Sequence, residues 1–299
     1  MFGLLNVNKP TGITSRDAVN TIQRLARPHK VGHAGTLDPL ASGVLVVCIG
    51  PATRLTDYVH AMAKQYVGTF QLGKRSDTED VDGEVVELDD PPVPTRGDLE
   101  DAIQSFIGDI EQVPPAYSAL KVDGKRAHEL AREGQEVALK AREVTIYEME
   151  LLEYEYPQMK LAIECSGGTY VRSLGRDLAE SLNTAAVMSN LVRTGIGDFG
   201  LDTAVELDTL TRESIREQML PPEAALSDLP RMDLTRKETE QISTGMRVFN
   251  REKIRGQEIV AFDHHGRLLS ILTPRGPRQL GPMRNFIDKP RKKRKRRSK

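Results

Sequence analysis

The chain has 299 residues, of which 28% are charged and 38% hydrophobic, and its net charge is −1. This composition is typical of a globular protein with room for one large domain and a small one. The longest apolar run, residues 44–49, is far shorter than the ~20 residues of a membrane helix, and residues 1–10 lack the basic and apolar regions of a signal peptide. These features exclude helical membrane spans and secretion, and they predict a cytoplasmic protein.

The order of the predicted elements indicates a mixed fold. Strands are predicted over residues 4–7, 44–49, 64–72, 144–147 and 159–165, and a tight hairpin turn is predicted at residues 123–124. Helices are predicted from Ser15, taken as the cap, to Leu25, over residues 52–62, from Thr95 to Phe106, over residues 127–132 and over residues 173–182. Interspersed strands and helices predict an α+β (mixed α/β) catalytic domain over residues 1–228, with a mixed, mainly antiparallel sheet flanked by helices.

Neither the acidic residues nor the cysteines predict a metal site or a disulfide. Residues 76–84 are acidic, but they lack the twelve-residue spacing and the terminal bidentate glutamate of a calcium loop. We therefore expect a solvated loop there. Cys48 and Cys165 lie in apolar, strand-like runs, so they are expected to be small buried side chains.

The pattern changes after the proline-rich residues 221–230. Short strands separated by turn residues follow, and residues 231–287 could form a small β-rich module that is stable when docked.

The end of the chain is strongly basic. The run from Lys289 to Lys299 (KPRKKRKRRSK) holds nine Lys or Arg and no acid, so subtracting it leaves a net charge of −10 on the other 288 residues. Like charges this dense predict a disordered arm over residues 288–299. Its natural partner is RNA, because neutralised phosphates release counterions. A solubilising tail and a nuclear address stay open from composition alone.

Asp38 lies in a glycine-punctuated stretch, GHAGTLDPLASGVL (residues 32–45), which leads into an apolar strand. Pro39 disfavours a helical conformation for the aspartate. Gly35 and Gly43 permit backbone angles closed to other residues and the close approach of a ligand. A carboxylate held at the mouth of a buried strand suits a nucleophile or base, whereas an Asx-type turn is the plainer interpretation. The residues of this stretch by themselves favour the turn.

The same stretch resembles the catalytic motif of the TruB family of tRNA pseudouridine synthases, and further matches follow in the expected order along most of the chain. The resemblance implies the pseudouridine synthase fold with Asp38 as its catalytic aspartate. By position and strand pattern, residues 231–287 resemble the PUA-like RNA-binding domain of the family. Residues 8–15 (NKPTGITS) match a further element, in which Lys9 and Pro10 would support the active-site loop.

Two more catalytic residues are implied by local matches. Residues 165–172 (CSGGTYVR) resemble a family segment that ends in an arginine, so Arg172 is expected to keep Asp38 ionised. Tyr66 resembles the tyrosine that stacks on the flipped base and helps to move the C5 proton.

Three residues are implied to bind the substrate. His33 resembles the histidine that enters the space left by the flipped uridine, and filling it would recover part of the few kcal/mol that flipping costs. Tyr170 resembles a second substrate-contacting tyrosine, and Leu191 the leucine that lines the uracil pocket. Val192 replaces the first of two arginines found there in the family, while Arg193 keeps the second.

The resemblance implies an isomerase that converts uridine to pseudouridine at position 55 in the tRNA T-arm, by base flipping and without a guide RNA. The reaction breaks the N1–C1′ bond, turns the base and joins C5 to C1′, so no cofactor is expected. The expected partner is tRNA, with no obligate protein partner and no membrane. Whether Asp38 attacks C1′ or C6, or removes a 2′ proton, stays open.

Two alternatives to this function stay open. One is a tRNA-folding chaperone in which catalysis is secondary, but a carboxylate aimed at a polyanion is electrostatically unfavourable for binding alone. The other is a guide-dependent relative, which would carry a larger RNA-binding extension.

Overall fold

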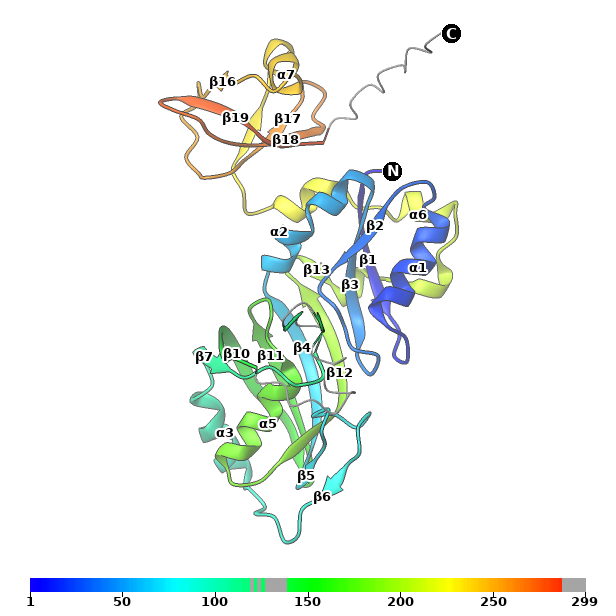
Figure 1. Ribbon diagram of the computed structural model, residues 1–299, viewed down its shortest axis with the longest axis vertical. Coiled ribbons are helices and arrows are strands. Elements are labelled where there is room, and N and C mark those ends of the chain that lie inside the picture. Colours follow the sequence, from blue (N-terminus) through cyan, green and yellow to red (C-terminus); the bar gives the residue numbers. More distant parts are fainter. Residues whose placement is uncertain (119–120, 123–124, 127–138, 287–299) are drawn as a thin grey trace. The chain divides into compact units, whose positions relative to one another are not determined.

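The computed structural model describes residues 1–118, 121–122, 125–126 and 139–286 (Figure 1). The predicted helix over residues 127–132, the turn at residues 123–124 and the basic arm over residues 288–299 lie outside the described residues. The chain forms two compact units, unit 1 (residues 3–219 with Met1) and unit 2 (from Leu220 onward). No helix in the described part of the chain is long and apolar enough to span a membrane.

Unit 1 is built on a mixed sheet. Its main path runs in the order β14 (Val205–Glu206), β1 (Gly3–Lys9), β3 (Ser42–Ile49), β12 (Ala186–Ile196), β4 (Lys64–Leu72), β11 (Gln158–Cys165), β10 (Arg142–Glu155) and β7 (Gly108–Gln112). β2 (Val31–Ala34) also pairs with β3, and β13 (Phe199–Gly200) with β12. Only the pairs β1–β14 and β3–β12 of this sheet, as described, are parallel, which confirms the predicted mixed, mainly antiparallel sheet. Two small ribbons lie outside it, β5 (Lys74–Arg75) with β6 (Val86–Glu87) and β8 (Lys121–Val122) with β9 (Lys125–Arg126).

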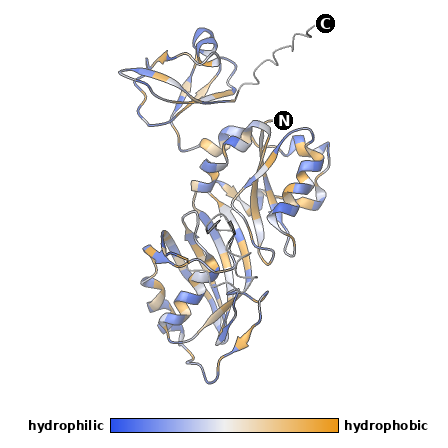
Figure 2. Cartoon of the chain, in the orientation of Figure 1, coloured by the Kyte–Doolittle hydropathy of each residue, from blue (hydrophilic) through white to orange (hydrophobic). Residues whose placement is uncertain are grey.

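The helices of unit 1 pack on this sheet, and among the described residues they contribute to two core clusters. The helices are α1 (Ser15–Leu25), α2 (Thr56–Ala61), α3 (Arg96–Gln104), α5 (Val171–Ser181) and α6 (Ser214–Glu217), with short 3-10 turns η1 (Gly50–Arg54), η2 (Leu201–Thr203) and η3 (Leu207–Thr209). One core cluster joins α3 and α5 to strands β4, β10, β11 and β12, and the other joins α1 and α6 to β1 and β3. Buried and more exposed residues alternate along β11, and Figure 2 shows hydrophilic and hydrophobic residues interleaved along the strands of this sheet.

The predicted cap of α1 and the predicted continuous helix over residues 52–62 were wrong. The cap of α1 is Thr14, whose hydroxyl accepts a hydrogen bond from the backbone N–H of Asp17, while the Asp17 carboxylate accepts from the N–H of Thr14 in return. The predicted helix over residues 52–62 consists of η1 followed by α2. The hydroxyls of Thr53 and Thr56 donate to the carbonyls of Gly50 and Thr53, and such bonds compete with the helical pattern.

Both cysteines are buried and unpaired, as predicted. Burial raises the pKa of the Cys48 thiol to about 12 and that of Cys165 to about 11, so both stay protonated at neutral pH.

Unit 2 has the predicted β-rich fold. Its sheet runs in the order β15 (Arg231–Asp233), β17 (Ile259–Phe262), β18 (Leu268–Pro274), β19 (Gln279–Asn285) and β16 (Val248–Phe249), preceded by η4 (Pro222–Leu226). Helix α7 (Arg236–Ser243) packs on it through the buried Ile242, which joins a core of aliphatic side chains from β15 to β19.

Candidate active site

The Asp38 loop connects β2 to β3, two antiparallel strands of unit 1. Leu37 is buried, and its backbone is held by Ser15, whose hydroxyl accepts from the Leu37 N–H (2.8 Å) and donates to the Leu37 carbonyl (3.0 Å). The next side chain, Asp38, is 41% exposed. The loop therefore presents an accessible carboxylate from a fixed backbone.

The glycines of this loop admit the close approach of another part of the protein. Gly43 has φ +101, and a Cβ built there would lie 2.2 Å from the carbonyl oxygen of Arg193 on β12. Gly35 has φ +89, and a Cβ there would lie 3.3 Å from the Arg193 guanidinium. The glycines are thus needed for close packing between the loop, β3 and β12.

Arg172, in the first turn of α5, forms an ion pair with Asp38. One guanidinium nitrogen lies 3.1 Å from Asp38 Oδ2, and the other lies 3.3 Å from Asp80 Oδ2. The same nitrogens donate to the carbonyls of Thr78 (2.6 Å) and Tyr117 (3.2 Å). Because its side chain is only 6% exposed, Arg172 is a buried cation shared by an exposed and a buried carboxylate.

The expectation of a solvated loop over residues 76–84 was wrong for two of its acids. Glu79 and Asp80 are 9% and 4% exposed. They are buried because both pair with arginines of α5, Asp80 with Arg172 and Glu79 with Arg176. The acidic composition of this stretch favoured solvent, and it held no local signal of these two ion pairs.

Tyr66 and Leu191 lie on neighbouring strands beside this pair of charges. Tyr66 on β4 is opposite Arg193 on β12, and Leu191 is opposite Gly68. Burial raises the pKa of the Tyr66 hydroxyl, and a hydrogen bond with Arg193 opposes the shift. Both side chains belong to the apolar cluster that includes Leu37 of the Asp38 loop.

Lys9 and Pro10 lie against the same loop. The buried Lys9 ammonium donates to the carbonyls of Pro10 and Ile13, both at 2.8 Å. Burial lowers its pKa to about 8, and the negative charge of Asp38 opposes that shift. The turn that Lys9 holds is bonded to the loop by the Gly12 N–H, which donates to the Pro39 carbonyl (2.8 Å).

Tyr170 is fixed by a residue that the sequence analysis did not single out. The side-chain amide of Gln112 accepts from the Tyr170 N–H (2.8 Å) and donates to the Tyr170 carbonyl (3.1 Å). The guanidinium of Arg142 lies 4.7 Å from the centre of the Tyr170 ring. Because Gln112 is fully buried and Tyr170 is the N-cap of α5, this clamp fixes the start of the helix that carries Arg172.

His33 lies on the Arg193 side of the site. Burial lowers its pKa to about 4, with further effects from Arg16, His60 and Arg193, so the ring is neutral at pH 7. Its Nδ1 atom is buried and has no hydrogen-bond partner in the described part of the chain. Among the interactions of the described residues, none joins the His33 ring to Asp38.

The arrangement suits chemistry on an uncharged planar group. It combines an accessible carboxylate, a buried counter-charge, a phenol ring and an apolar wall. Across the described residues, no group of three or more His, Cys, Asp or Glu side chains could hold a metal ion.

Comparison with known proteins identifies the family. Residues 23–171 match the family model described as "TruB family pseudouridylate synthase (N terminal domain)". A tRNA pseudouridine synthase B from Clostridium kluyveri is 41% identical over 254 residues, which cover 83% of this chain and 86% of that protein. The chain belongs to the TruB family. It is therefore a pseudouridine synthase, which is an isomerase.

Further TruB relatives and solved structures agree. A tRNA pseudouridine synthase B from Synechocystis is 43% identical over 240 residues, covering 78% of this chain and 81% of that protein. A structure of an H/ACA RNP bound to a substrate RNA containing 2′-deoxyuridine shares the fold, with a TM-score of 0.72 and 23% identity over 96% of this chain and 86% of that one. A Cbf5–Nop10–Gar1 complex gives a TM-score of 0.68 and 25% identity over 93% and 79% of the two chains.

Proposed function

We propose that this TruB protein converts uridine to pseudouridine at position 55 in the T-arm of tRNA, and that it needs no guide RNA. The observation that carries the proposal is the accessible carboxylate of Asp38 held 3.1 Å from the buried guanidinium of Arg172. A protein that only binds RNA gains nothing from a carboxylate directed at a polyanion. The substrate is supported by relatives named tRNA pseudouridine synthase B at 41–43% identity.

The residues of the site divide the chemistry between them. The uridine leaves the helical stack, at a cost of a few kcal/mol, and enters the site between Tyr66 and Leu191. Asp38 acts at the sugar or at C6, and the N1–C1′ bond breaks. The base turns while it lies on the Tyr66 ring, and C5 joins C1′. The C5 proton is then lost, N1 gains a proton, and the atoms balance without a redox partner or cofactor.

Arg172 holds Asp38 in position and offsets its charge while the substrate is bound. Tyr170 contacts the substrate from the start of α5, and His33 enters the space that the uridine leaves. His33 suits that space because its ring is neutral at pH 7 and its Nδ1 has no partner within the described residues. Lys9 and Pro10 support the Asp38 loop.

Unit 2 is proposed to be a small PUA-like RNA-binding domain, corresponding to residues 231–287, with the basic arm at Lys289 to Lys299 as an additional phosphate contact. Four arginines of this unit pair with carboxylates, namely Arg231, Arg236, Arg251 and Arg267. Around the edge strand β16, the exposed Arg247, Arg275 and Arg278 have no carboxylate partner among the described residues. Phe249 lies among them and is 55% exposed. Arginines without a carboxylate partner that lie beside an exposed aromatic ring suit the binding of a nucleic acid.

We place the enzyme in the cytoplasm. Both cysteines are unpaired and buried, which is typical of a reducing compartment. We propose that the reaction requires no protein partner, because Asp38, Arg172 and Tyr66 all come from one unit of one chain.

The test is pseudouridine mapping on an unmodified tRNA transcript incubated with the purified full chain and no other RNA. We expect pseudouridine at position 55 with the wild type and none with Asp38→Asn. Product at another uridine would refute the substrate, and product with Asp38→Asn would refute the mechanism. Binding without turnover by the wild type would favour a chaperone.

A further inference from the structure

A second cluster of charges lies directly behind Arg172 and takes no part in the proposed chemistry. Glu79 accepts a hydrogen bond from the hydroxyl of Ser173 (2.6 Å) and forms an ion pair with Arg176. Ser173 and Arg176 are three positions apart on α5, so they lie on one side of the helix, and Arg176 follows Arg172 by about one turn. Glu79 is 9% exposed, and burial raises the pKa of its carboxyl. A buried carboxylate is costly, and only its partners offset that cost.

The backbone of Glu79 is also unusual. Its φ is +64, in the left-handed region that residues other than glycine rarely adopt. Two hydrogen bonds fix this turn to β12, one from the Met188 N–H to the Glu79 carbonyl and one from the Val81 N–H to the Met188 carbonyl, both 3.0 Å. The strained conformation persists because β12 and α5 hold the turn from two sides.

This turn sets the position of the groups that hold Arg172. The residues on either side of Glu79 both face the guanidinium, with the Thr78 carbonyl at 2.6 Å and the Asp80 carboxylate at 3.3 Å. Three consecutive residues of the loop, 78–80, therefore contact three residues of α5, namely Arg172, Ser173 and Arg176. If the contacts of Glu79 with α5 are lost, its left-handed backbone can relax. Thr78 and Asp80 then move away from Arg172.

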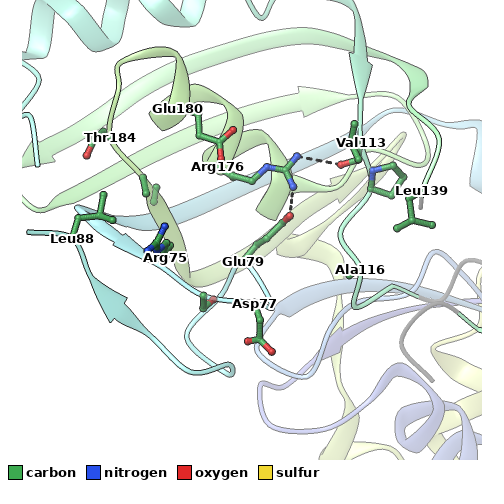
Figure 3. A pocket seen from close by; sticks show the side chains of 14 residues that line it. Arg75, Asp77, Glu79, Leu88, Val113, Ala116, Leu139, Arg176, Glu180 and Thr184 are labelled. Carbon is green, nitrogen blue, oxygen red and sulfur yellow. Dashed lines mark hydrogen bonds and ion pairs between the residues drawn. The ribbon is translucent and has the colours of Figure 1, made fainter. Parts of the chain in front are cut away.

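The ion pair is not required to fill a close-packed core. Glu79 and Arg176 lie at the wall of an open pocket of about 540 Å³, whose other lining residues include Arg75, Asp77 and Glu180 (Figure 3). Arg176 also donates to the carbonyl of Val113 (3.2 Å), as Figure 3 shows. The ion pair and hydrogen bond of Glu79 therefore explain its position better than close packing does.

We propose that Glu79 is a positioning residue for pseudouridine formation. Its contacts with Ser173 and Arg176 fix the turn that holds Asp80 against Arg172, and Arg172 in turn holds Asp38. This inference rests on the proposed roles of Asp38 and Arg172.

The test measures single-turnover pseudouridine formation on an unmodified tRNA transcript, together with the Kd for that RNA. Glu79→Gln keeps an acceptor for Ser173 and removes the ion pair, whereas Glu79→Gly removes the side chain but relieves the left-handed backbone. We expect the rate at saturating RNA to fall at least about tenfold in both variants, because a displacement of about 1 Å can cost up to about a hundredfold. The Kd should stay within about twofold, because Glu79 lies behind Arg172 and touches no proposed RNA contact.

A double-mutant cycle shows whether Glu79 acts through Asp80. Combined with Asp80→Asn, Glu79→Gln should lower the rate by less than about twofold further, because residues that act through one another are not additive. The matched control is Asp177→Asn, which removes the other carboxylate of Arg176 (2.7 Å) without touching the loop. It should leave the rate within about twofold of the wild type.

The outcomes separate this inference from the proposed function. Wild-type rates in both Glu79 variants would overturn the inference alone, as would losses that multiply in the double mutant or an equal loss in Asp177→Asn. If both Glu79 variants lose their rate only because they unfold, circular dichroism at the assay temperature shows it, and that result also counts against a positioning role. Activity of Asp38→Asn would instead overturn the proposed function.

Discussion

Arg193 places a positive charge inside unit 1, and no carboxylate pairs with it within the part of the chain that is described. Its side chain is 1% exposed, and its nitrogens donate to the carbonyls of Val44 (2.7 Å) and Gly35 (3.0 Å). These acceptors and the Tyr66 hydroxyl satisfy the guanidinium, as a buried charge requires. After burial itself, Arg193 contributes to the lowered pKa of both Lys9 and His33. The Arg193 charge therefore affects the protonation of buried groups next to the Asp38 loop.

His33 gives this electrostatic arrangement a measurable consequence. Its pKa in the folded protein is about 4, against 6.5 for an unperturbed histidine, so the unfolded chain binds this proton more readily. The contribution of His33 to stability is fully present above pH 6.5 and is lost as the pH falls toward 4. We expect the free energy of unfolding, measured by urea titration at pH 7 and pH 5, to drop less in His33→Gln than in the wild type.

The control for this prediction is His264→Gln, which changes an exposed histidine of unit 2. It should leave the wild-type drop between pH 7 and pH 5 unchanged. An equal drop in His33→Gln and in the wild type would mean that the ring is not shielded from protons in the folded state.

At the scale of elements, helix α5 decides where Arg172 lies, and one glycine decides how closely α5 approaches the sheet. A Cβ built on Gly175 would lie 2.1 Å from Cε1 and 2.3 Å from Cδ1 of Phe70 on β4. Both atoms belong to a ring that is fully buried, so it has little room to move. Gly175 comes one turn after Arg172 in the same helix.

We predict that Gly175→Ala destabilises unit 1 by about 1–3 kcal/mol, as overpacking of a core does. In an ordinary helix, the same change stabilises by roughly 0.5–1 kcal/mol. Gly97→Ala in α3 is the matched control, because its Cβ would meet only Thr95 Oγ1, at 3.8 Å, and it should stabilise. Urea unfolding measures both variants, and adding Phe70→Leu to Gly175→Ala should recover part of the loss. A stabilised Gly175→Ala would contradict the packing argument.

The elements whose bounds were predicted accurately are those determined by residues close to them in the sequence. The period-two alternation of residues 64–72 predicted β4 with its observed bounds, and Thr95 was correctly placed at the start of α3. The start of α1 was misplaced because Thr14 and Ser15 are both good caps by type. The choice between them depends on Leu37, whose backbone occupies the Ser15 hydroxyl from 22 residues away. A local pattern does not contain that contact.

For the molecule as a whole, the sequence predicted the site residues that stand in recognisable local motifs and missed those whose roles depend on contacts with distant residues. Asp38 and Arg172 stand in motifs long enough to resemble a family, and the structure brings them together. Asp80 and Gln112 were missed because their roles depend on partners 92 and 58 positions away. Their local contexts, an acidic stretch and a polar strand end, favour exposure. Only the tertiary fold buries them.

Charge is divided unevenly over the molecule. The run from Lys289 to Lys299 holds nine basic residues, while the other 288 residues carry a net charge of −10. An acidic body repels RNA at long range, so a basic segment has to supply the general attraction. Sequence choice on the tRNA is expected to come from the site in unit 1, because phosphate contacts position a nucleic acid without reading it.

Deletion of residues 289–299 should therefore weaken binding of an unmodified tRNA transcript and reduce its dependence on salt. Each phosphate contact that is lost lowers the slope of log K against log salt concentration by about 0.9 for a duplex, and fluorescence titrations between low and physiological salt measure it. A full-length variant with the nine basic residues replaced by Ser and Gln controls for the length of the arm and should behave like the deletion. Pseudouridine should still form at the wild-type position in both, because Asp38 and its partners are intact. A salt slope equal to that of the wild type would show that the attraction for RNA arises elsewhere, and the unpaired arginines beside β16 would then be the residues to replace.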